Sequence, residues 1–164
     1  MKAALATASI ATPVGMVELA ANADALVSIR ICAARLPERH DVGHALLDEA
    51  VSQMRAWFAG ARKSFALPLA PSDSIEGEQL RAAIASIPYG ETATYGALAS
   101  AAGSIARAVG QACKINPFPI LIPCHRVVSA AGREYYSAGA GLETKAWLLD
   151  FEALNAHGIR RRLL

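Results

Sequence analysis

The chain has 164 residues, of which 54% are hydrophobic and 18% are charged, and its formal net charge at pH 7 is +2. This length suits one domain or two small ones, and the composition excludes an intrinsically disordered chain. No apolar run reaches the ~18 residues that a membrane span needs, so we expect no membrane-spanning segment. The net charge is too small to indicate a nucleic-acid partner by itself, so such a hypothesis depends on where the charges lie.

The chain begins MKAALATASIA, which loosely imitates a secretory signal. Thr7 and Ser9 interrupt the apolar centre of this segment, which continues directly into strand-like alternation, so we interpret it as part of the mature protein. The three cysteines of the chain, Cys32, Cys113 and Cys124, show no CxxC spacing and give no zinc pattern with the histidines. This cysteine usage favours the reducing cytoplasm, and we expect no metal site.

Short strands and one helix are predicted for the first part of the chain. A turn at TPVG precedes a strand that includes Met16–Leu19, and a turn at Asn22–Asp24 precedes a second strand from Ala25 to Ile31. From His44 to Phe58, apolar residues recur at the helical period, and Gly60 ends this predicted helix.

A domain boundary is predicted at the segment Pro68–Ser74, which combines two prolines with a polar cluster. Phe65–Leu67, just before it, is expected to form the last strand of the first part. The sequence therefore predicts an N-terminal α/β domain over residues 1–74 and a mainly helical C-terminal domain over residues 75–164.

The C-terminal part begins with a predicted helix. Asp73, with Glu76 three residues later, is a helix start signal. The helical period then continues through Leu80, Ala83, Ile84 and Ile87. Pro88 stops this helix, because proline lacks the amide hydrogen that a helix interior requires.

Two short helices are predicted to follow, separated by a glycine-containing turn. Thr94 is suited to cap a helix from Tyr95 to Ala102, which Gly103 closes. Ser104 is suited to cap a second helix from Ile105 to about Lys114. This arrangement is the helix-turn-helix pattern, although any pair of short helices produces it.

The second of these short helices has two distinct faces. The residues expected to pack inward follow the i, i+3, i+4, i+7 spacing and are Ile105, Ala108, Val109 and Ala112. The opposite face carries Arg107, Gln111 and Lys114, which can reach the phosphates and base edges of DNA. A solvated polar face explains the same pattern, and periodicity alone favours that alternative.

The segment NPFPILIPCHRVV, residues 116–128, carries the strongest chemical signal. Two prolines and an aliphatic strand are expected to deliver Cys124 next to His125, and an imidazole can deprotonate a thiol directly or through a water. Alternatively, Cys124 is an inert buried cysteine. Since adjacent residues on a strand point to opposite faces, His125 would need a bend in the chain or a water to serve Cys124.

Three runs of sequence surround this cysteine: IPYGETATYGALA, RAVGQACKINPFPILIPCHRVV and YSAGAGLETKAWLLDFE. Together they resemble the 6-O-alkylguanine-DNA alkyltransferases, or methylated-DNA–protein-cysteine methyltransferases, strongly over residues 88–152 and more loosely before them. The resemblance implies a ribonuclease-H-like α/β domain followed by a winged helix-turn-helix-like helical domain. It also implies DNA repair by direct reversal, once per molecule and without a cofactor.

The same resemblance implies a mechanism. Cys124 would take the alkyl group from the guanine 6-oxygen by direct displacement, and His125 would act as its base through a water. Glu152 would orient the imidazole, and Asn116 would hold the turn that leads to the cysteine. From its position alone, Glu152 would be an ordinary exposed charge near the end of a helix.

The resemblance further implies that the protein binds alkylated double-stranded DNA in the minor groove and rotates the damaged nucleotide out of the stack. Arg107 would fill the vacated space, while Tyr95 would press on the target phosphate and help to drive the rotation. No membrane partner is implied, and we expect the protein to act as a monomer.

The pocket for the alkylated base is also assigned by the resemblance. The backbone around Val127, with Tyr136 and Ser137 from the following loop, would close over the base. Pro119 would help to wall the alkyl group, and Cys113 would lie near it.

The sequence departs from the family pattern in several places. Gly103–Ile105 replaces an Asn-Pro-containing turn between the two short helices, and the loop Tyr136–Gly141 is one residue longer than usual. Glu76 stands where the family has an aromatic residue, and Cys113 stands where it has a larger apolar one. These departures bear on substrate range and efficiency rather than on the type of reaction.

Other functions fit parts of the sequence. A non-catalytic module that recognises alkylated DNA is one alternative, although family relatives of that kind lack the cysteine that this chain has at position 124. A helix-turn-helix regulator and a cysteine hydrolase are two more, but neither a sensor domain nor an oxyanion site is recognisable. The basic tail Arg160–Arg162 either contacts phosphate or is a solvated terminus.

Overall fold

A computed structural model describes residues 4–131 and 134–158. These residues fall into two compact units that divide between Ala70 and Pro71, within the proline-containing segment Pro68–Ser74. Across the described ranges, no helix is long and apolar enough to cross a membrane. The basic tail Arg160–Arg162 lies outside them.

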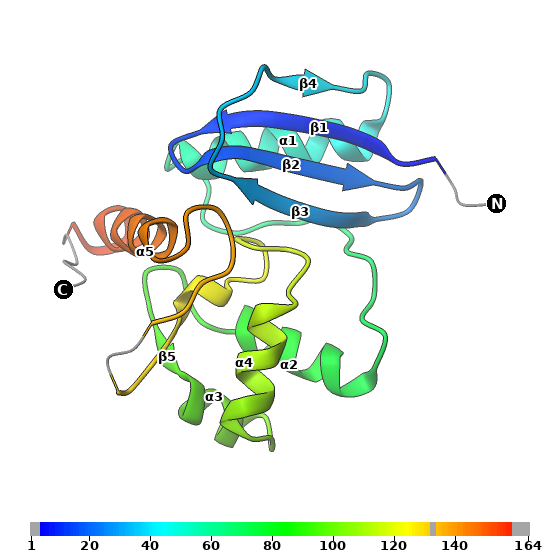
Figure 1. Ribbon diagram of the computed structural model, residues 1–164. Coiled ribbons are helices and arrows are strands. Elements are labelled where there is room, and N and C mark those ends of the chain that lie inside the picture. The colour runs from blue at the N-terminus through cyan, green and yellow to red at the C-terminus, as the bar shows by residue number, and fades with distance from the viewer. Residues whose placement is uncertain (1–3, 132–133, 159–164) are drawn as a thin grey trace. The chain divides into compact units, whose positions relative to one another are not determined.

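The N-terminal unit is an antiparallel sheet with one helix (Figure 1). Its strands are β1 (Ala6–Thr12), β2 (Gly15–Ala21), β3 (Leu26–Cys32) and β4 (Arg39–His40), in the order β3-β2-β1-β4. The predicted strand around Met16–Leu19 is confirmed as β2, and β3 begins one residue later than expected. Strand β4 was not predicted, because a strand of two residues has no periodicity to detect.

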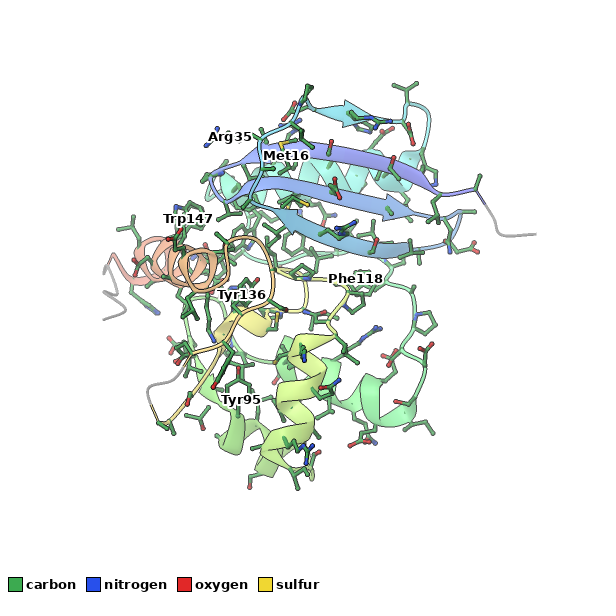
Figure 2. All side chains as sticks on the ribbon, viewed as in Figure 1. Met16, Arg35, Tyr95, Phe118, Tyr136 and Trp147 are labelled. Carbon is green, nitrogen blue, oxygen red and sulfur yellow. The ribbon has the colours of Figure 1, made fainter. Side chains whose placement is uncertain are left out.

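Helix α1 (Ala45–Phe58) confirms the predicted helix and begins at the N-cap His44, whose Nδ1 accepts a hydrogen bond from the Leu47 amide at 3.2 Å. Its inward face follows the helical period and consists of Leu47, Ala50, Val51, Met54 and Trp57, all buried. These side chains form one core with the sheet, to which Val17 and Leu19 of β2 also belong. Met16 of β2 is buried as well (Figure 2), but strand alternation places it on the opposite face of the sheet.

The expected strand at Phe65–Leu67 is wrong. The side-chain amide of Gln53 binds both backbone groups of Ala66: Oε1 accepts from its N–H at 2.9 Å, and Nε2 donates to its carbonyl at 3.3 Å. Because these two backbone groups are already satisfied, Ala66 has no ladder to join. The segment instead touches the sheet through a single bridge between Leu69 and Leu26.

The C-terminal unit is mainly helical (Figure 1). Its helices are α2 (Ile75–Ala85), α3 (Tyr95–Ala101), α4 (Ala106–Lys114) and α5 (Leu142–His157). Helices α3 and α4 pack on each other across Gly103, whose φ of 64° suits the left-handed position that ends a helix. This pair confirms the predicted helix-turn-helix.

Three helix boundaries differ in detail from those predicted. Thr94 caps α3 as expected, with Oγ1 accepting from the Ala97 amide at 3.1 Å. However, Ser74 rather than Asp73 caps α2. Helix α4 begins without a side-chain cap, because its N-cap residue is Ile105 rather than Ser104, and an isoleucine side chain has no acceptor. Helix α2 ends at Ala85, two residues before the last expected position.

The aliphatic strand expected before Cys124 is also wrong. Residues 117–122 form bends around one turn, because the prolines at 117, 119 and 123 remove amide hydrogens that a strand ladder needs. Phe118, within this segment, is completely buried (its side chain is labelled in Figure 2). Ile120 has a φ of 76°, which is strained for a β-branched residue. A short 3-10 helix, η1 (Cys124–Arg126), follows, so Cys124 and His125 do not lie on a strand.

Two short parallel strands connect the start of α3 to the segment that carries Cys124. Strand β5 (Ala93–Thr94) pairs with β6 (Val127–Val128), with Ala93 opposite Val127. Since β5 leads directly into α3 and β6 directly follows η1, this pairing holds the start of α3 beside the segment that carries Cys124.

Candidate active site and nucleic-acid interface

Cys124 is the first residue of η1, and its exposed fraction is only 6%. Asn116 binds this segment through its whole side-chain amide. Nδ2 donates to Cys124 Sγ at 3.3 Å and to the Ile122 carbonyl at 2.8 Å, while Oδ1 accepts from the Phe118 amide at 2.9 Å. Asn116 therefore fastens the turn and supplies a donor to the sulfur.

His125, the next residue, belongs to a buried network with Glu152 of α5. His125 Nε2 donates to Glu152 Oε1 at 2.7 Å, and Arg126 donates to both carboxylate oxygens, through Nε at 2.9 Å and NH2 at 2.8 Å. The Gly90 amide also donates to Glu152, at 3.3 Å, and Arg126 NH1 donates to the Ile87 carbonyl at 2.7 Å. His125 Nδ1 is buried and, within the described residues, has no hydrogen-bond partner.

The charges in this network are set by burial and by a permanent cation. Burial alone would raise the pKa of Glu152, but the His125 imidazole and the Arg126 guanidinium lower it to about 2. Burial lowers the pKa of His125 despite the neighbouring carboxylate. Glu152 is therefore ionised and paired with Arg126, and His125 is neutral, with Nδ1 as the ring nitrogen that accepts a proton.

The thiol of Cys124 needs a base. Burial raises its pKa, while the Asn116 hydrogen bond and the charge of Lys145 act in the opposite direction. Because burial dominates, the resting state is a thiol rather than a thiolate. A neutral imidazole on the adjacent residue is therefore the group that can generate the nucleophile.

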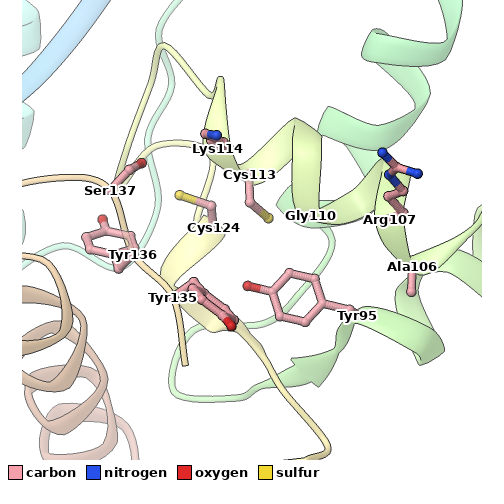
Figure 3. A pocket seen from close by; sticks show the side chains of 10 residues that line it. All are labelled: Tyr95, Ala106, Arg107, Gly110, Cys113, Lys114, Cys124, Tyr135, Tyr136 and Ser137. Carbon is pink, nitrogen blue, oxygen red and sulfur yellow. The ribbon is translucent and has the colours of Figure 1, made fainter. Parts of the chain in front are cut away.

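Cys124 opens into a cavity of about 590 Å³ (Figure 3). Its lining includes these residues predicted from the sequence: Tyr95, Arg107, Cys113, Lys114, Cys124, Tyr136 and Ser137. Three further lining residues were not predicted as site residues: Ala106, Gly110 and Tyr135. Ala106 and Gly110 share one face of α4 with Cys113, so helical spacing could have indicated them. The cavity is lined by two thiols, three tyrosine rings and two cations, with small residues between them.

Burial also determines the ionisation of the lining groups. Burial raises the pKa of Tyr95 to about 12, with smaller contributions from the neighbouring thiols. Burial and the Cys124 sulfur raise the pKa of the Tyr136 phenol well above its usual value. Burial raises the pKa of Cys113 to about 12. At neutral pH both phenols are therefore hydrogen-bond donors, and Cys113 is a thiol.

Six of the predicted site residues do not line this cavity. His125 and Glu152 belong to the buried network instead. Asn116 contacts Cys124 by the hydrogen bond from Nδ2 to its sulfur. Pro119 and Val127 are buried, and the carbonyl of Val127 accepts a hydrogen bond from Lys145 at 2.7 Å. Gln111 lies on the exposed side of α4, beyond the cavity wall.

Helix α4 presents its polar face to solvent. Arg107, Gln111 and Lys114 are all exposed, so the predicted polar face is confirmed. Val109 is completely buried, as predicted, but Ile105 is 66% exposed and does not pack inward. Ile105 is the N-cap residue and precedes the first turn of α4, which places its side chain outside the helix packing.

Two buried cations were missed by sequence reasoning. Arg126 directly follows Cys124 and His125 in the chain, and only its contact with Glu152 reveals its role in the network. Lys145 is 1% exposed, and its ammonium binds Glu134 at 2.6 Å. Lys145 and Glu152 are i and i+7 on α5, so they share one face of that helix, and this spacing was the available signal.

No group of three or more His, Cys, Asp or Glu side chains that could hold a metal ion occurs within residues 4–131 and 134–158. Helix α5 contributes an acidic and a basic group, but each is paired with protein groups: Glu152 with His125 and Arg126, and Lys145 with Glu134.

Comparison with known proteins covers both units. The ribonuclease-like domain of 6-O-methylguanine DNA methyltransferase matches residues 5–71, and the DNA binding domain of the same family matches residues 77–154. The chain belongs to the 6-O-methylguanine DNA methyltransferase family. The resemblance seen in the sequence and the expected two-domain fold are thus confirmed.

Individual members of this family are similar over most of their length. The methylated-DNA–protein-cysteine methyltransferase of Mycobacterium leprae is 37% identical over 150 residues, which cover 88% of this chain and 90% of that protein. The crystal structure of Mycobacterium tuberculosis O6-methylguanine methyltransferase matches with a TM-score of 0.78 and 33% identity, covering 92% and 94% of the two chains. Mycobacterium tuberculosis OGT, crystallised in complex with DNA, matches with a TM-score of 0.76 and 33% identity, covering 90% and 92%.

Proposed function

We propose that this protein repairs alkylated DNA by direct reversal, moving the alkyl group from the 6-oxygen of guanine to Cys124 in one irreversible transfer per molecule. The observation that carries the proposal is the position of Cys124, whose sulfur opens into the cavity while the residue beside it belongs to the His125–Glu152 network. The names of the relatives, methylated-DNA–protein-cysteine methyltransferases, support the same reaction.

The transfer is a nucleophilic displacement at the alkyl carbon. His125 Nδ1 takes the proton of the Cys124 thiol, directly or through a water, and Glu152 stabilises the imidazolium that forms. The sulfur then forms the new S–C bond as the bond between carbon and the guanine 6-oxygen breaks. The phenols of Tyr95 and Tyr136, which stay protonated, can donate to the negative charge that develops on the leaving guanine.

A guanine inside a duplex cannot reach this cavity, so the nucleotide must rotate out of the stack. We propose that α4 lies in the minor groove, where Arg107, beside the cavity, fills the space that the base leaves. Tyr95 would press on the target phosphate, and Gln111 and Lys114 would contact the backbone. The relative that was crystallised with DNA supports a DNA partner.

We also propose a monomer acting in the cytoplasm. All the groups required for the transfer, from Tyr95 and Arg107 to Cys124 and Glu152, belong to a single chain. A nucleophilic thiol must also stay reduced until it meets its substrate, which suits a reducing compartment.

Intact-protein mass spectrometry tests the proposal. The protein is mixed with a duplex that contains one 6-O-methylguanine or with the unmodified duplex, and the same is done for Cys124→Ser, Cys113→Ser and Cys32→Ser. Cys32 lies on β3 and is the matched control, because it is a free cysteine of the N-terminal unit. We expect a stoichiometric gain of one methyl group, mapped to Cys124 and lost only in Cys124→Ser among the three variants.

Two results would contradict this expectation. Methylation that persists in Cys124→Ser would place the acceptor elsewhere, with Cys113 as the first alternative because it lines the same cavity. Tight binding of the alkylated duplex without any change in protein mass would instead indicate a non-catalytic damage-recognition module.

A further inference from the structure

Tyr135 lines the cavity, but the proposed methyl transfer gives this residue no role. Its exposed fraction is 67%, although it lines the same cavity as Cys124. The next residue, Tyr136, lies beside Cys124 in the lining of the same cavity (Figure 3). Ligand pockets are lined predominantly by hydrophobic and aromatic side chains, so a ring that lines a cavity and stays exposed is a candidate contact for a ligand.

The backbone at Tyr135 is fixed although its ring is exposed. The buried ammonium of Lys145 donates to the Tyr135 carbonyl at 3.3 Å, to the Val127 carbonyl at 2.7 Å and to Glu134 Oε2 at 2.6 Å. Glu134 Oε1 in turn accepts from the Ser129 amide at 3.0 Å. The loop that carries Tyr135 is therefore tied to α5 and to β6.

A buried ion pair of this kind contributes little net stability compared with well-packed apolar residues, because both charges must leave water. Here the ion pair fixes the position of the loop that carries Tyr135. Of the three donors on Lys145, one reaches β6 and two reach the residues on either side of the Glu134–Tyr135 peptide. The pair thereby sets where the Tyr135 side chain leaves the backbone.

The exposed ring of Tyr135 can contact the flat face of a planar ligand in the cavity. Tyr135 and Tyr95 come from different segments and lie near each other in the lining of the cavity (Figure 3). A purine that enters beside Cys124 presents two apolar faces and a polar edge. Every base has such a face, so an aromatic ring at this place binds it without reading its hydrogen-bonding groups.

We propose that Tyr135 stacks on the extruded alkylated guanine and that the Glu134–Lys145 pair is the positioning device for this ring. The proposal rests on the proposed function, since it concerns the same cavity. Stacking of one base on an aromatic side chain corresponds to about 5- to 150-fold in affinity.

Saturation kinetics of methyl transfer test the proposal, with Tyr135→Ala, Tyr135→Phe and the control Leu142→Ala. Leu142 begins α5 and is also an exposed large apolar residue, but it does not line the cavity. Two substrates are used: the duplex with one 6-O-methylguanine and the free base 6-O-methylguanine. For Tyr135→Ala we expect the half-saturating concentration of both substrates to rise about 5- to 150-fold at an unchanged limiting rate, whereas Tyr135→Phe and Leu142→Ala retain wild-type values.

The positioning role is tested by Glu134→Gln, alone and combined with Tyr135→Ala. Glu134→Gln should raise the half-saturating concentration in the wild-type background. It should add nothing further to Tyr135→Ala, because the pair acts through the ring. An additive effect in the double variant would overturn the positioning role.

Each remaining outcome overturns the stacking assignment in a distinguishable way. Wild-type values for Tyr135→Ala would remove the ring from binding altogether. A fall in the limiting rate of Tyr135→Ala would place the side chain in the transfer step rather than in binding. Failure of Tyr135→Phe to retain wild-type values would assign the role to the hydroxyl instead. A change with the duplex but not with the free base would place the contact on DNA outside the base. If the wild-type protein transfers no methyl group from either substrate, the proposed function itself has failed.

Discussion

His125 Nε2 lies 2.7 Å from Glu152 Oε1, and both side chains are completely buried, although they are far apart in the sequence. Because Arg126 binds the same carboxylate, Glu152 stays ionised, and the hydrogen of the neutral imidazole is held on Nε2. The other ring nitrogen is left to accept a proton.

Replacing Glu152 with Gln keeps the shape of the side chain but removes its charge, leaving the buried Arg126 without an anion. Breaking a buried ion pair in this way costs about 3–5 kcal/mol. We therefore expect the free energy of unfolding to fall by this amount, with at least a tenfold slower methyl transfer. Urea unfolding and single-turnover rates measure both. Glu143→Gln, an exposed carboxylate in the first turn of α5, should change neither by much; a similar loss there would point to a general effect of charge on this helix.

Replacing His125 with Gln should change the pH dependence of the transfer rate. Burial lowers the pKa of His125 and raises that of Cys124, so the wild-type rate should be nearly constant between about pH 6.5 and 8.5. Without the base, the thiolate must form by loss of its proton to solvent. The rate of the variant should then rise about tenfold per pH unit over this range. His40→Gln, on β4, should keep the flat profile, and parallel profiles for wild type and His125→Gln would contradict the role of base.

Stability should fall in acid because of Glu152. Its pKa is about 2 in the folded protein and 4.5 in the unfolded chain. Between these pH values the unfolded chain therefore binds more protons than the folded protein. The stabilisation is therefore complete above pH 4.5 and is lost as the pH falls towards 2, a total of about 3 kcal/mol. Urea unfolding across this range should show a steeper loss for the wild type than for Glu152→Gln. Equal slopes would mean that other carboxylates determine the acid sensitivity.

Replacing Gly90 with Ala should disturb the site from outside the cavity. Gly90 has a φ of 81°, and a Cβ there would lie 2.5 Å from Ala156 Cβ on α5, the helix that carries Glu152. We expect destabilisation of about 1–3 kcal/mol and a slower transfer. Gly96→Ala is the matched control, because a Cβ at that position of α3 meets nothing within 4 Å. It should be neutral or stabilising by up to ~1 kcal/mol. Equal effects of the two substitutions would refute the clash.

The sequence alone determined the elements whose signals are local. Helix α1 followed from the period of its apolar residues, α3 from the Thr94 cap, and the exposed face of α4 from the spacing of Arg107, Gln111 and Lys114. The run around Cys124 was sufficient to predict the family. Such signals are readable because a helix repeats over neighbouring residues and a cap acts over a single turn.

Tertiary structure decided where a side chain from one segment replaces the backbone partner of another. Gln53 binds the backbone of Ala66 and prevents the expected strand. It also turned an apparently exposed charge, Glu152, into the buried partner of His125, and it set Lys145 beneath the loop of Tyr135. These contacts join residues that are distant in sequence, so no periodic pattern indicates them. A charge can be buried only where the folded chain places a partner beside it, and that placement is decided by the tertiary structure.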